Sequence, residues 1–321
     1  MTDRRRSRPY GWERVLFMFQ RCYFITISDM FNLPNPAVCG IIKDVSAQRF
    51  SVTRARQYIQ SGENMSTHVI AVAGKGGVGK TTTCGMIIEQ LIREGKGPLL
   101  VVDADANSNL NEVLGVEVET TLGDIREEMA RAELLPVSPI PSGMTKQEYA
   151  EYKFNSALIE EDDFDMLVMG RTQGKGCYCY VNGVLKSQVD KYYGQYGYMV
   201  IDNEAGLEHI SRGTLPHVDT LLLISDCSRR GIQAAARIAE MVGELELRPG
   251  QMKLIVNRAP DGNLSDGVKE EIEKHGLDLA GVLPHDELVY EYDCDGKPSA
   301  KVPEDAPVKV ALNSILHTLG L

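Results

Sequence analysis

The sequence predicts a doubly wound α/β fold, in which a mostly parallel sheet carries helices on both faces. Short apolar segments alternate along the chain with stretches of helical periodicity, which is the pattern of repeated strand–helix–strand units. The apolar segments are continuous rather than alternating, as is typical of parallel strands buried on both sides. A glycine-rich turn joins the first apolar segment to a helical stretch, at the sheet edge where ligands bind in this class of fold.

The individual elements follow from these patterns. The predicted strands lie near Val69–Ala73, Pro98–Val102, Met166–Met169, Tyr198–Ile201, Thr220–Ile224 and Met252–Asn257. The predicted helices lie at Thr81–Glu94, Gly231–Glu246, Asp266–His275 and Pro307–Leu319. The acidic stretch 116–164 shows no clear period, and we expect an irregular, solvated surface insertion there.

The chain divides into two parts of different composition. Residues 65–321 form the α/β domain, whereas residues 1–64 lack a sustained period and hold more basic than acidic side chains. Two explanations of the first part compete: an accessory extension, mobile or loosely packed, and an over-extended reading frame with its true start at Met65. We favour the second explanation, because Met65 stands directly before the first strand.

Charge and cysteine content limit the classes of function. The chain has 321 residues and a net charge of −11, which argues against nucleic-acid binding through bulk electrostatics. No apolar segment approaches the roughly 20 residues of a membrane-spanning helix. Seven cysteines, an odd number without a regular framework, indicate a reducing compartment, and we expect a cytoplasmic protein.

The glycine-rich turn matches the phosphate-binding pattern G-x-x-x-x-G-K-[ST], between a strand and a helix as that motif requires. Its glycines let backbone N–H groups point at phosphate oxygens, and the helix N-terminus adds a partial positive charge. Lys80 is expected to reach the β- and γ-phosphates and the Thr81 hydroxyl to bind Mg²⁺. The sequence thus predicts a P-loop NTPase whose ATP contacts come from Gly74, Gly76, Gly77, Val78, Gly79, Lys80, Thr81 and Thr82.

Acidic residues follow two other predicted strands. Asp103 and Asp105 come just after the second strand, where a ligand would lie, although a turn or capping role is the alternative for either. Asp202 ends a later strand and Gly206 follows it, which is the Walker B and switch II pattern. Asp202 should support Mg²⁺ through water, and the Gly206 N–H can sense the γ-phosphate.

Cys177 and Cys179 lie in a glycine-flanked stretch that we expect to be an extended loop, with both thiolates turned to one side. Two thiolates supply half of a tetrahedral site, and a second subunit across a twofold axis would supply the rest. Spacing alone is a weak signal, and two ordinary loop side chains remain the alternative.

The string GKGGVGKT resembles the deviant Walker A motif of a dimeric ATPase family that includes nitrogenase iron protein, the ParA and MinD partition ATPases and CooC-type nickel-insertion ATPases. The resemblance implies that Lys75 crosses the dimer interface to the nucleotide of the partner subunit. It also implies that Asp103 holds water or Mg²⁺ and that Asp105 orients the attacking water. Asn257 would recognise adenine, and the segment around Pro284 would line the base on its other side.

The stretches GKGCYCYVNG and IDNEAGLEHISRGT narrow the resemblance to the CooC-type ATPases of carbon monoxide dehydrogenase maturation. In that group the Cys-x-Cys pair, here Cys177 and Cys179, binds Ni²⁺ or Zn²⁺ between two subunits. The expected function is therefore an ATP-dependent nickel metallochaperone. It would act as a homodimer and serve carbon monoxide dehydrogenase or acetyl-CoA synthase.

Two other functions are weighed against this one. An electron donor like nitrogenase iron protein would need cluster cysteines from two separated positions, and the switch II stretch DNEAGLEH contains none. A positioning ATPase like MinD or ParA would need a membrane-binding tail or a DNA-binding basic patch. The last residues, 309–321, lack a basic face, and the net acidic charge disfavours DNA.

Overall fold

The computed structural model describes residues 66–107, 109–132, 140–171, 177–205 and 217–321, all of which belong to a compact unit spanning Phe50–Leu321. Residues 1–64 lie outside the described residues, so the two explanations of that segment stay as stated.

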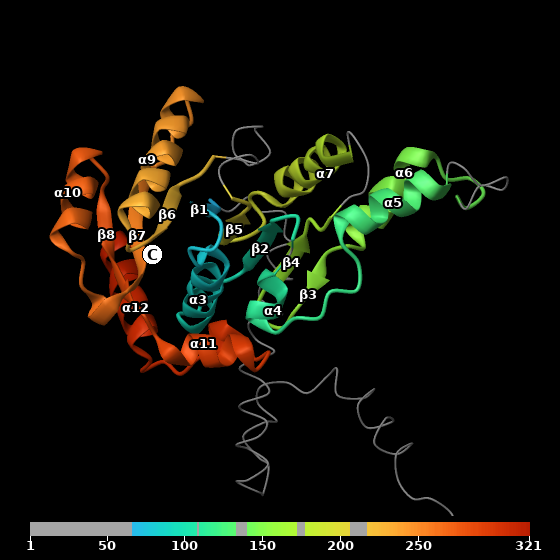
Figure 1. Cartoon of the computed structure of the whole chain (residues 1–321). Helices are drawn as coiled ribbons and strands as arrows, with labels where there is room; N and C mark the ends of the chain where they lie inside the picture. Colours follow the sequence, from blue (N-terminus) through green and yellow to red (C-terminus); the bar gives the residue numbers. More distant parts are fainter. Residues whose placement is uncertain (1–65, 108, 133–139, 172–176, 206–216) are drawn as a thin grey trace, which may run out of the picture. The chain divides into compact units, whose positions relative to one another are not determined.

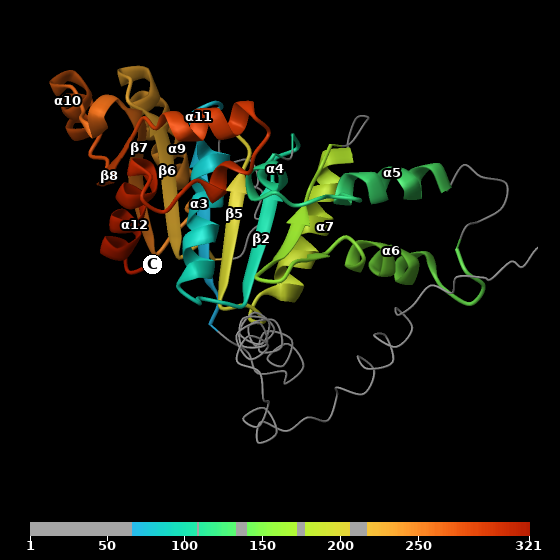
Figure 2. The ribbon, with the colours of Figure 1, turned by 90° about the horizontal axis from the view of Figure 1, so that it is seen from below.

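An eight-stranded sheet runs through the described residues in the order β3-β4-β2-β5-β1-β6-β7-β8 (Figures 1 and 2). Neighbouring strands are parallel except β3, which pairs antiparallel with β4. The bounds are β1 His68–Gly74, β2 Leu99–Ala104, β3 Ile159–Glu160, β4 Asp165–Val168, β5 Tyr198–Asn203, β6 Thr220–Asp226, β7 Gln251–Ala259 and β8 Leu279–Pro284. The predicted mostly parallel sheet is confirmed, and each predicted strand is present within a few residues of its expected bounds.

Helices cover both faces of the sheet, as the doubly wound fold requires (Figure 1). One face carries α3 Lys80–Arg93, α4 Leu110–Leu114, α11 Glu287–Cys294 and α12 Pro307–Leu319. The other carries α5 Leu122–Ala132, α6 Lys146–Asn155, α7 Cys177–Tyr192, α9 Arg229–Glu244 and α10 Asp266–Lys274. Two short 3₁₀ turns, Pro260–Gly262 and Ser299–Lys301, complete the described elements.

The strands divide their side chains between two apolar cores. Val69 and Ala71 of β1 pack with the α5, α6, α7, α9 and α10 side, while Ile70 and Val72 pack with the α3, α4 and α12 side. All four are fully buried. Because each fully buried aliphatic side chain contributes about 1.5–3 kcal/mol, a strand apolar on both faces has a strong preference for this central position.

The expectation of an irregular insertion at 116–164 is wrong. The segment contains α5, α6 and the edge strand β3, and Leu122, Ile125 and Phe154 pack into the core. Helix α6 begins at a capping box in which Thr145 and Glu148 satisfy each other's backbone N–H groups. The few apolar positions that anchor these helices do not stand out in the sequence, because many acidic side chains surround them on the exposed faces.

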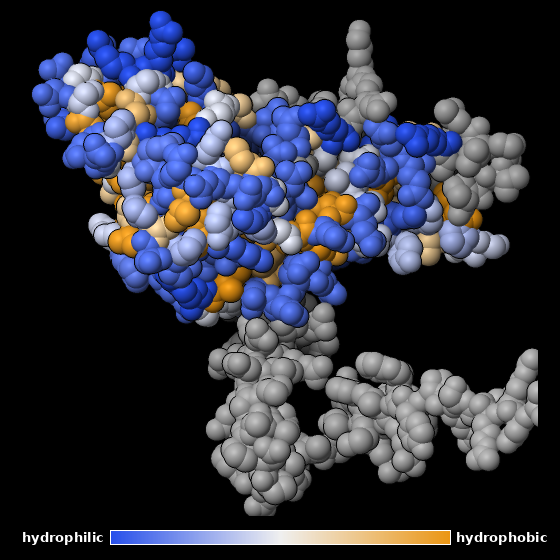
Figure 3. Space-filling model, turned by 60° about the horizontal axis from the view of Figure 1, so that its bottom comes forward, coloured by the Kyte–Doolittle hydropathy of each residue, from blue (hydrophilic) through white to orange (hydrophobic). Residues whose placement is uncertain are grey.

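The face shown in Figure 3 is mostly hydrophilic, with apolar residues in small separate groups. None of the described helices is both long enough and apolar enough to cross a membrane. The apolar face of helix α12 packs inside the protein, where Val308, Leu312, Ile315 and Leu316 are buried.

Candidate functional site

The predicted phosphate-binding loop joins β1 to α3 at the carboxyl edge of the sheet. Gly74 lies so close to β6 that a Cβ atom there would stand 2.3 Å from the Ile224 carbonyl oxygen. Gly77 and Gly79 have φ angles of 79° and 90°, in the left-handed region that favours glycine. The loop therefore requires glycine for two reasons: close packing against β6 and left-handed backbone.

Two consecutive residues of β7 hold this loop in place. The Asn257 side-chain amide donates to the Val78 carbonyl oxygen at 3.0 Å, and the Arg258 guanidinium donates to the Gly77 carbonyl oxygen at 3.1 Å. A Cβ atom on Gly79 would come within 2.4 Å of the Asn257 amide nitrogen. These two hydrogen bonds tie successive carbonyl groups of the loop to β7 and so support its conformation. Sequence reasoning missed Arg258, although it directly follows Asn257 at the strand end.

The two lysines of the loop differ in environment. Lys80, the first residue of α3, is buried, and its ammonium donates to the Lys75 carbonyl oxygen at 3.4 Å. Lys75 itself is exposed. The buried ammonium is thus held inside the loop, whereas the Lys75 side chain is exposed to solvent, and its contact with a partner subunit remains a prediction.

Asp202 lies on β5 beside the start of α3, and its carboxylate is 1% exposed. Within the described residues neither carboxylate oxygen has a hydrogen-bond partner of ordinary geometry. Burial raises the pKa of Asp202 to about 7, although the nearby Thr81 hydroxyl and Lys80 ammonium act in the opposite direction. An unsatisfied buried carboxylate beside a threonine hydroxyl offers the oxygen ligands that Mg²⁺ prefers, so these residues fit that ion.

Asp103 pairs in register with Asp202 across β2 and β5, and it is also fully buried. Its two carboxylate oxygens accept the backbone N–H groups of Asp105, at 3.0 Å, and of Leu110, at 3.2 Å. Burial, and next the Asp202 carboxylate, raise the pKa of Asp103 to about 8. The described contacts of Asp103 therefore shape the loop after β2, and its contact with Mg²⁺ or water remains a prediction.

Asp105 lies in the same loop and is partly exposed. Its carboxylate accepts the Asn107 N–H at 2.8 Å, which closes a turn just beyond the carboxyl end of β2. The residue therefore lies at the same sheet edge as the phosphate loop. Its predicted role in orienting water is not tested by these contacts.

A cavity of about 210 Å³ opens beside the phosphate loop and brings Asn257 and Pro284 together. Helix α3, the ends of β7 and β8, and α11 form its walls. Its lining residues are Thr82, Thr83, Met86, Asn257, Arg258, Pro284, His285, Asp286, Val289, Tyr290, Asp293 and Val308. The two residues that sequence similarity assigns to a nucleotide base thus line one cavity, next to the helix that begins with Lys80 and Thr81.

The predicted metal ligands Cys177 and Cys179 and the predicted switch residue Gly206 lie in or next to segments that the structure does not describe. The backbone is helical from Cys177 onward, so the expectation of an extended loop at Cys177 and Cys179 is wrong. The side chains of these two cysteines, and Gly206, lie outside the described residues. Within the described residues, no group of three or more His, Cys, Asp or Glu side chains is placed to hold a metal ion.

Comparison with known proteins agrees with this geometry. The profile of the CobQ/CobB/MinD/ParA nucleotide-binding domain matches residues 69–299. An uncharacterised ATP-binding protein of Methanocaldococcus jannaschii is 44% identical over 253 residues, which cover 78% of this chain and 98% of that protein. The carbon monoxide dehydrogenase accessory protein CooC of Rhodospirillum rubrum is 27% identical over 245 residues, covering 68% of this chain and 89% of CooC.

Among solved structures, MinD of Pyrococcus horikoshii in complex with Mg-ADP has the same fold. It superposes with a TM-score of 0.59 at 19% identity, over 79% of this chain and 96% of that one.

Asp202→Asn removes a buried carboxylate whose ionised form the fold disfavours. Because folding raises its pKa from 3.8 to about 7, the ligand-free protein loses stability as the pH rises through that interval. The variant should therefore melt at a higher temperature than wild type near neutral pH, and this difference in melting temperature should be smaller in acid. The variant should also lose the stabilisation that Mg²⁺ and ATP give to wild type. Thermal melts across this pH range, with and without Mg²⁺–ATP, measure both effects.

The exposed carboxylate of Asp162 provides the control, since Asp162→Asn should change neither quantity. An Asp202→Asn protein stabilised by Mg²⁺–ATP as strongly as wild type would contradict the assignment of Asp202 to the ion.

Proposed function

This chain belongs to the CobQ/CobB/MinD/ParA family of P-loop ATPases, and on that premise we propose that it is a cytoplasmic ATP-dependent nickel metallochaperone. ATP would close a homodimer, a shared thiolate site would hold Ni²⁺ or Zn²⁺, and hydrolysis would release the metal ion to a client enzyme. The client class that we propose is carbon monoxide dehydrogenase or acetyl-CoA synthase.

Described residues of the phosphate loop and the neighbouring cavity support the proposed ATP site. The N–H groups of the loop 74–79 and the buried Lys80 would bind the phosphates, while Asn257 and Pro284 would hold the base. Thr81 and Asp202 would hold Mg²⁺, which neutralises phosphate charge when bound. The orphaned carboxylate of Asp202 is the observation that supports this ion.

The position of the cysteine pair in the fold supports the proposed nickel site. Strand β4 runs parallel to β2, so its carboxyl end lies at the sheet edge that carries the phosphate loop, and α7 begins soon afterwards at Cys177. Cysteine at a helix N-terminus generally favours the thiolate form, which is the form that binds metal ions. The likeness to CooC, a carbon monoxide dehydrogenase accessory protein, supports the same client class for this chain.

The helical backbone at the cysteine pair has a consequence for the proposed site. Side chains two positions apart do not share a face of a regular helix. For Cys177 and Cys179 to supply two ligands to one ion, the first turn of α7 must open when the metal ion binds. If the site is shared between two subunits, as proposed, this opening would accompany dimer closure, and the free subunit would lack the complete site.

The packing of α12 argues against this helix as a membrane anchor, which is one way in which a positioning ATPase could act. MinD of Bacillus subtilis is 24% identical to this chain over 264 residues, so a MinD-like role is the second candidate. A helix that attaches a protein to a membrane needs an available apolar face. In this chain the apolar face of α12 packs against β8 and α3 inside the core.

Lys75→Ala tests the proposed contact across the dimer. Because Lys75 is exposed and Lys80 is buried in the loop, the variant should bind ATP as wild type does. It should fail to dimerise with ATP, and its turnover should fall by roughly a thousandfold or more, as when an arginine finger is removed. Sedimentation with a non-hydrolysable ATP analogue and a phosphate-release assay measure the two effects.

Lys80→Ala is the matched comparison, since it should abolish ATP binding itself. A monomeric Lys75→Ala protein that hydrolyses ATP at the wild-type rate would show that the lysine does not act across an interface.

Metal stoichiometry tests the cysteine site. With a non-hydrolysable ATP analogue present, the wild-type protein should bind one Ni²⁺ per dimer, because each subunit supplies only half of a tetrahedral thiolate set. Replacing both Cys177 and Cys179 with alanine should remove that ion and leave ATP binding intact. Equilibrium dialysis of Ni²⁺ under reducing, anaerobic conditions, with parallel ATP titrations, measures both.

Cys294 is an exposed cysteine on α11, and Cys294→Ala serves as the control that should keep the ion. Equal nickel binding by wild type and the double variant would exclude the cysteine pair. One ion per monomer, independent of dimerisation, would exclude a shared site.

A further inference from the structure

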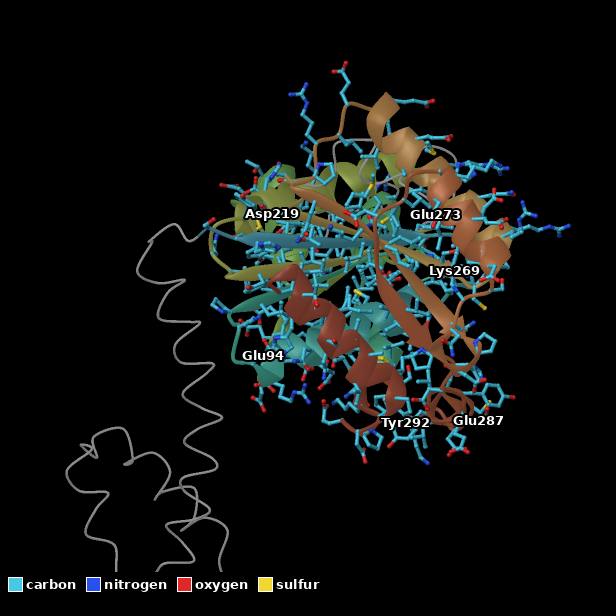
Figure 4. The ribbon with its side chains drawn as sticks, turned by 90° about the vertical axis from the view of Figure 1, so that its left-hand side faces the viewer. Glu94, Asp219, Lys269, Glu273, Glu287 and Tyr292 are labelled. Atoms are coloured by element: carbon cyan, nitrogen blue, oxygen red, sulfur yellow. The ribbon has the colours of Figure 1, made fainter. Side chains whose placement is uncertain are left out.

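Helix α11 presents one face to the cavity beside the phosphate loop. Its N-cap residue Asp286 and then Val289, Tyr290 and Asp293 all line that cavity. Their spacing of three and four residues is that of a single helical face. Figure 4 shows α11, marked by Glu287 and Tyr292, on the side of the sheet opposite Lys269 and Glu273 of α10.

Tyr290 is the aromatic residue on this face, and it is 60% exposed. Its hydroxyl lies beside the Cys294 thiol one turn further along the helix. The neighbouring Tyr292 behaves differently, since it packs against the core and lies 5.6 Å from the Lys297 ammonium, measured to its ring centre. Helix α11 is therefore anchored without Tyr290, whose ring is available to a ligand in the cavity.

The chemistry of the cavity suits a flat heteroaromatic ring. Met86 and Val289 give it an apolar lining, Pro284 contributes a second flat surface, and the Asn257 amide contributes a polar group. The same cavity contacts Thr82 and Thr83 of α3, whose first residues, Lys80 and Thr81, belong to the phosphate loop. A nucleotide with its phosphates at the loop would thus carry its base toward α11.

We propose that Tyr290 stacks on the purine base of ATP and is a base-positioning residue of this site. The inference rests on the proposed placement of the base between Asn257 and Pro284. Stacking between a base and an aromatic side chain draws on the π-face of both rings, so it requires the ring of Tyr290 and not its hydroxyl.

Affinity measurements on variants of Tyr290 test this proposal. Tyr290→Ala should weaken ATP binding about tenfold, the effect of losing one stacked aromatic ring, while leaving the affinity for ribose 5-triphosphate unchanged. Tyr290→Phe should bind ATP as wild type does, because it keeps the ring. Isothermal titration of both ligands with Mg²⁺, together with a thermal melt of each variant, gives these values.

Tyr152→Ala is the matched control, because Tyr152 on α6 is 62% exposed and lies outside the cavity. Wild-type protein that binds ATP no better than ribose 5-triphosphate would overturn the base placement itself. A second outcome is that wild type binds ATP more tightly than ribose 5-triphosphate and that Tyr290→Ala keeps this full difference. That result would support the base placement and overturn only the role of Tyr290. Loss of binding in Tyr290→Phe would also overturn it, since the hydroxyl would then be the essential group.

Discussion

The parallel register of the central strands is the constraint on which the site depends. Val72 of β1 and Asp103 of β2 both align with Asp202 of β5, so three chain segments distant in sequence end at one edge. Apolar side chains fill both faces of these strands, and an unpaired polar group buried among them would be strongly destabilising. Polar residues are therefore confined to the strand ends, and parallel strands bring their carboxyl ends together.

Strand β7 links the phosphate loop at this edge to the neighbouring cavity. The side chains of Asn257 and Arg258 hold successive carbonyl groups of the phosphate loop, while the same two residues line the cavity beside α3. A ligand that contacts Asn257 would thus act on a group already bonded to the loop. This shared use offers a physical route by which occupation of the cavity alters the phosphate loop.

Much of this arrangement could be predicted from the sequence, because its signals are local. The glycines and Lys80 of the loop form a contiguous motif, and Asp103 and Asp202 stand at the ends of continuous apolar runs. Helices α5 and α6 were missed because their core contacts depend on isolated residues, such as Phe154, among many exposed charges. The helical state of Cys177 was missed because its glycine-rich surroundings indicate a loop. Arg258 gave no local signal, since its role arises from a hydrogen bond to the distant phosphate loop. The role that we propose for Tyr290 likewise depends on a cavity lined by segments distant in sequence.

We propose that nucleotide and metal ion bind at the same edge of the sheet and that each changes the affinity of the protein for the other. Two binding sites that are coupled must influence each other equally. The direct measurement is the Kd for Ni²⁺ with a non-hydrolysable ATP analogue and with ADP, together with the Kd for each nucleotide with and without Ni²⁺. We expect Ni²⁺ to bind more tightly with the ATP analogue than with ADP. Ni²⁺ should increase the affinity for the analogue relative to ADP by the same factor. Nickel affinity that is the same in both nucleotide states would contradict it.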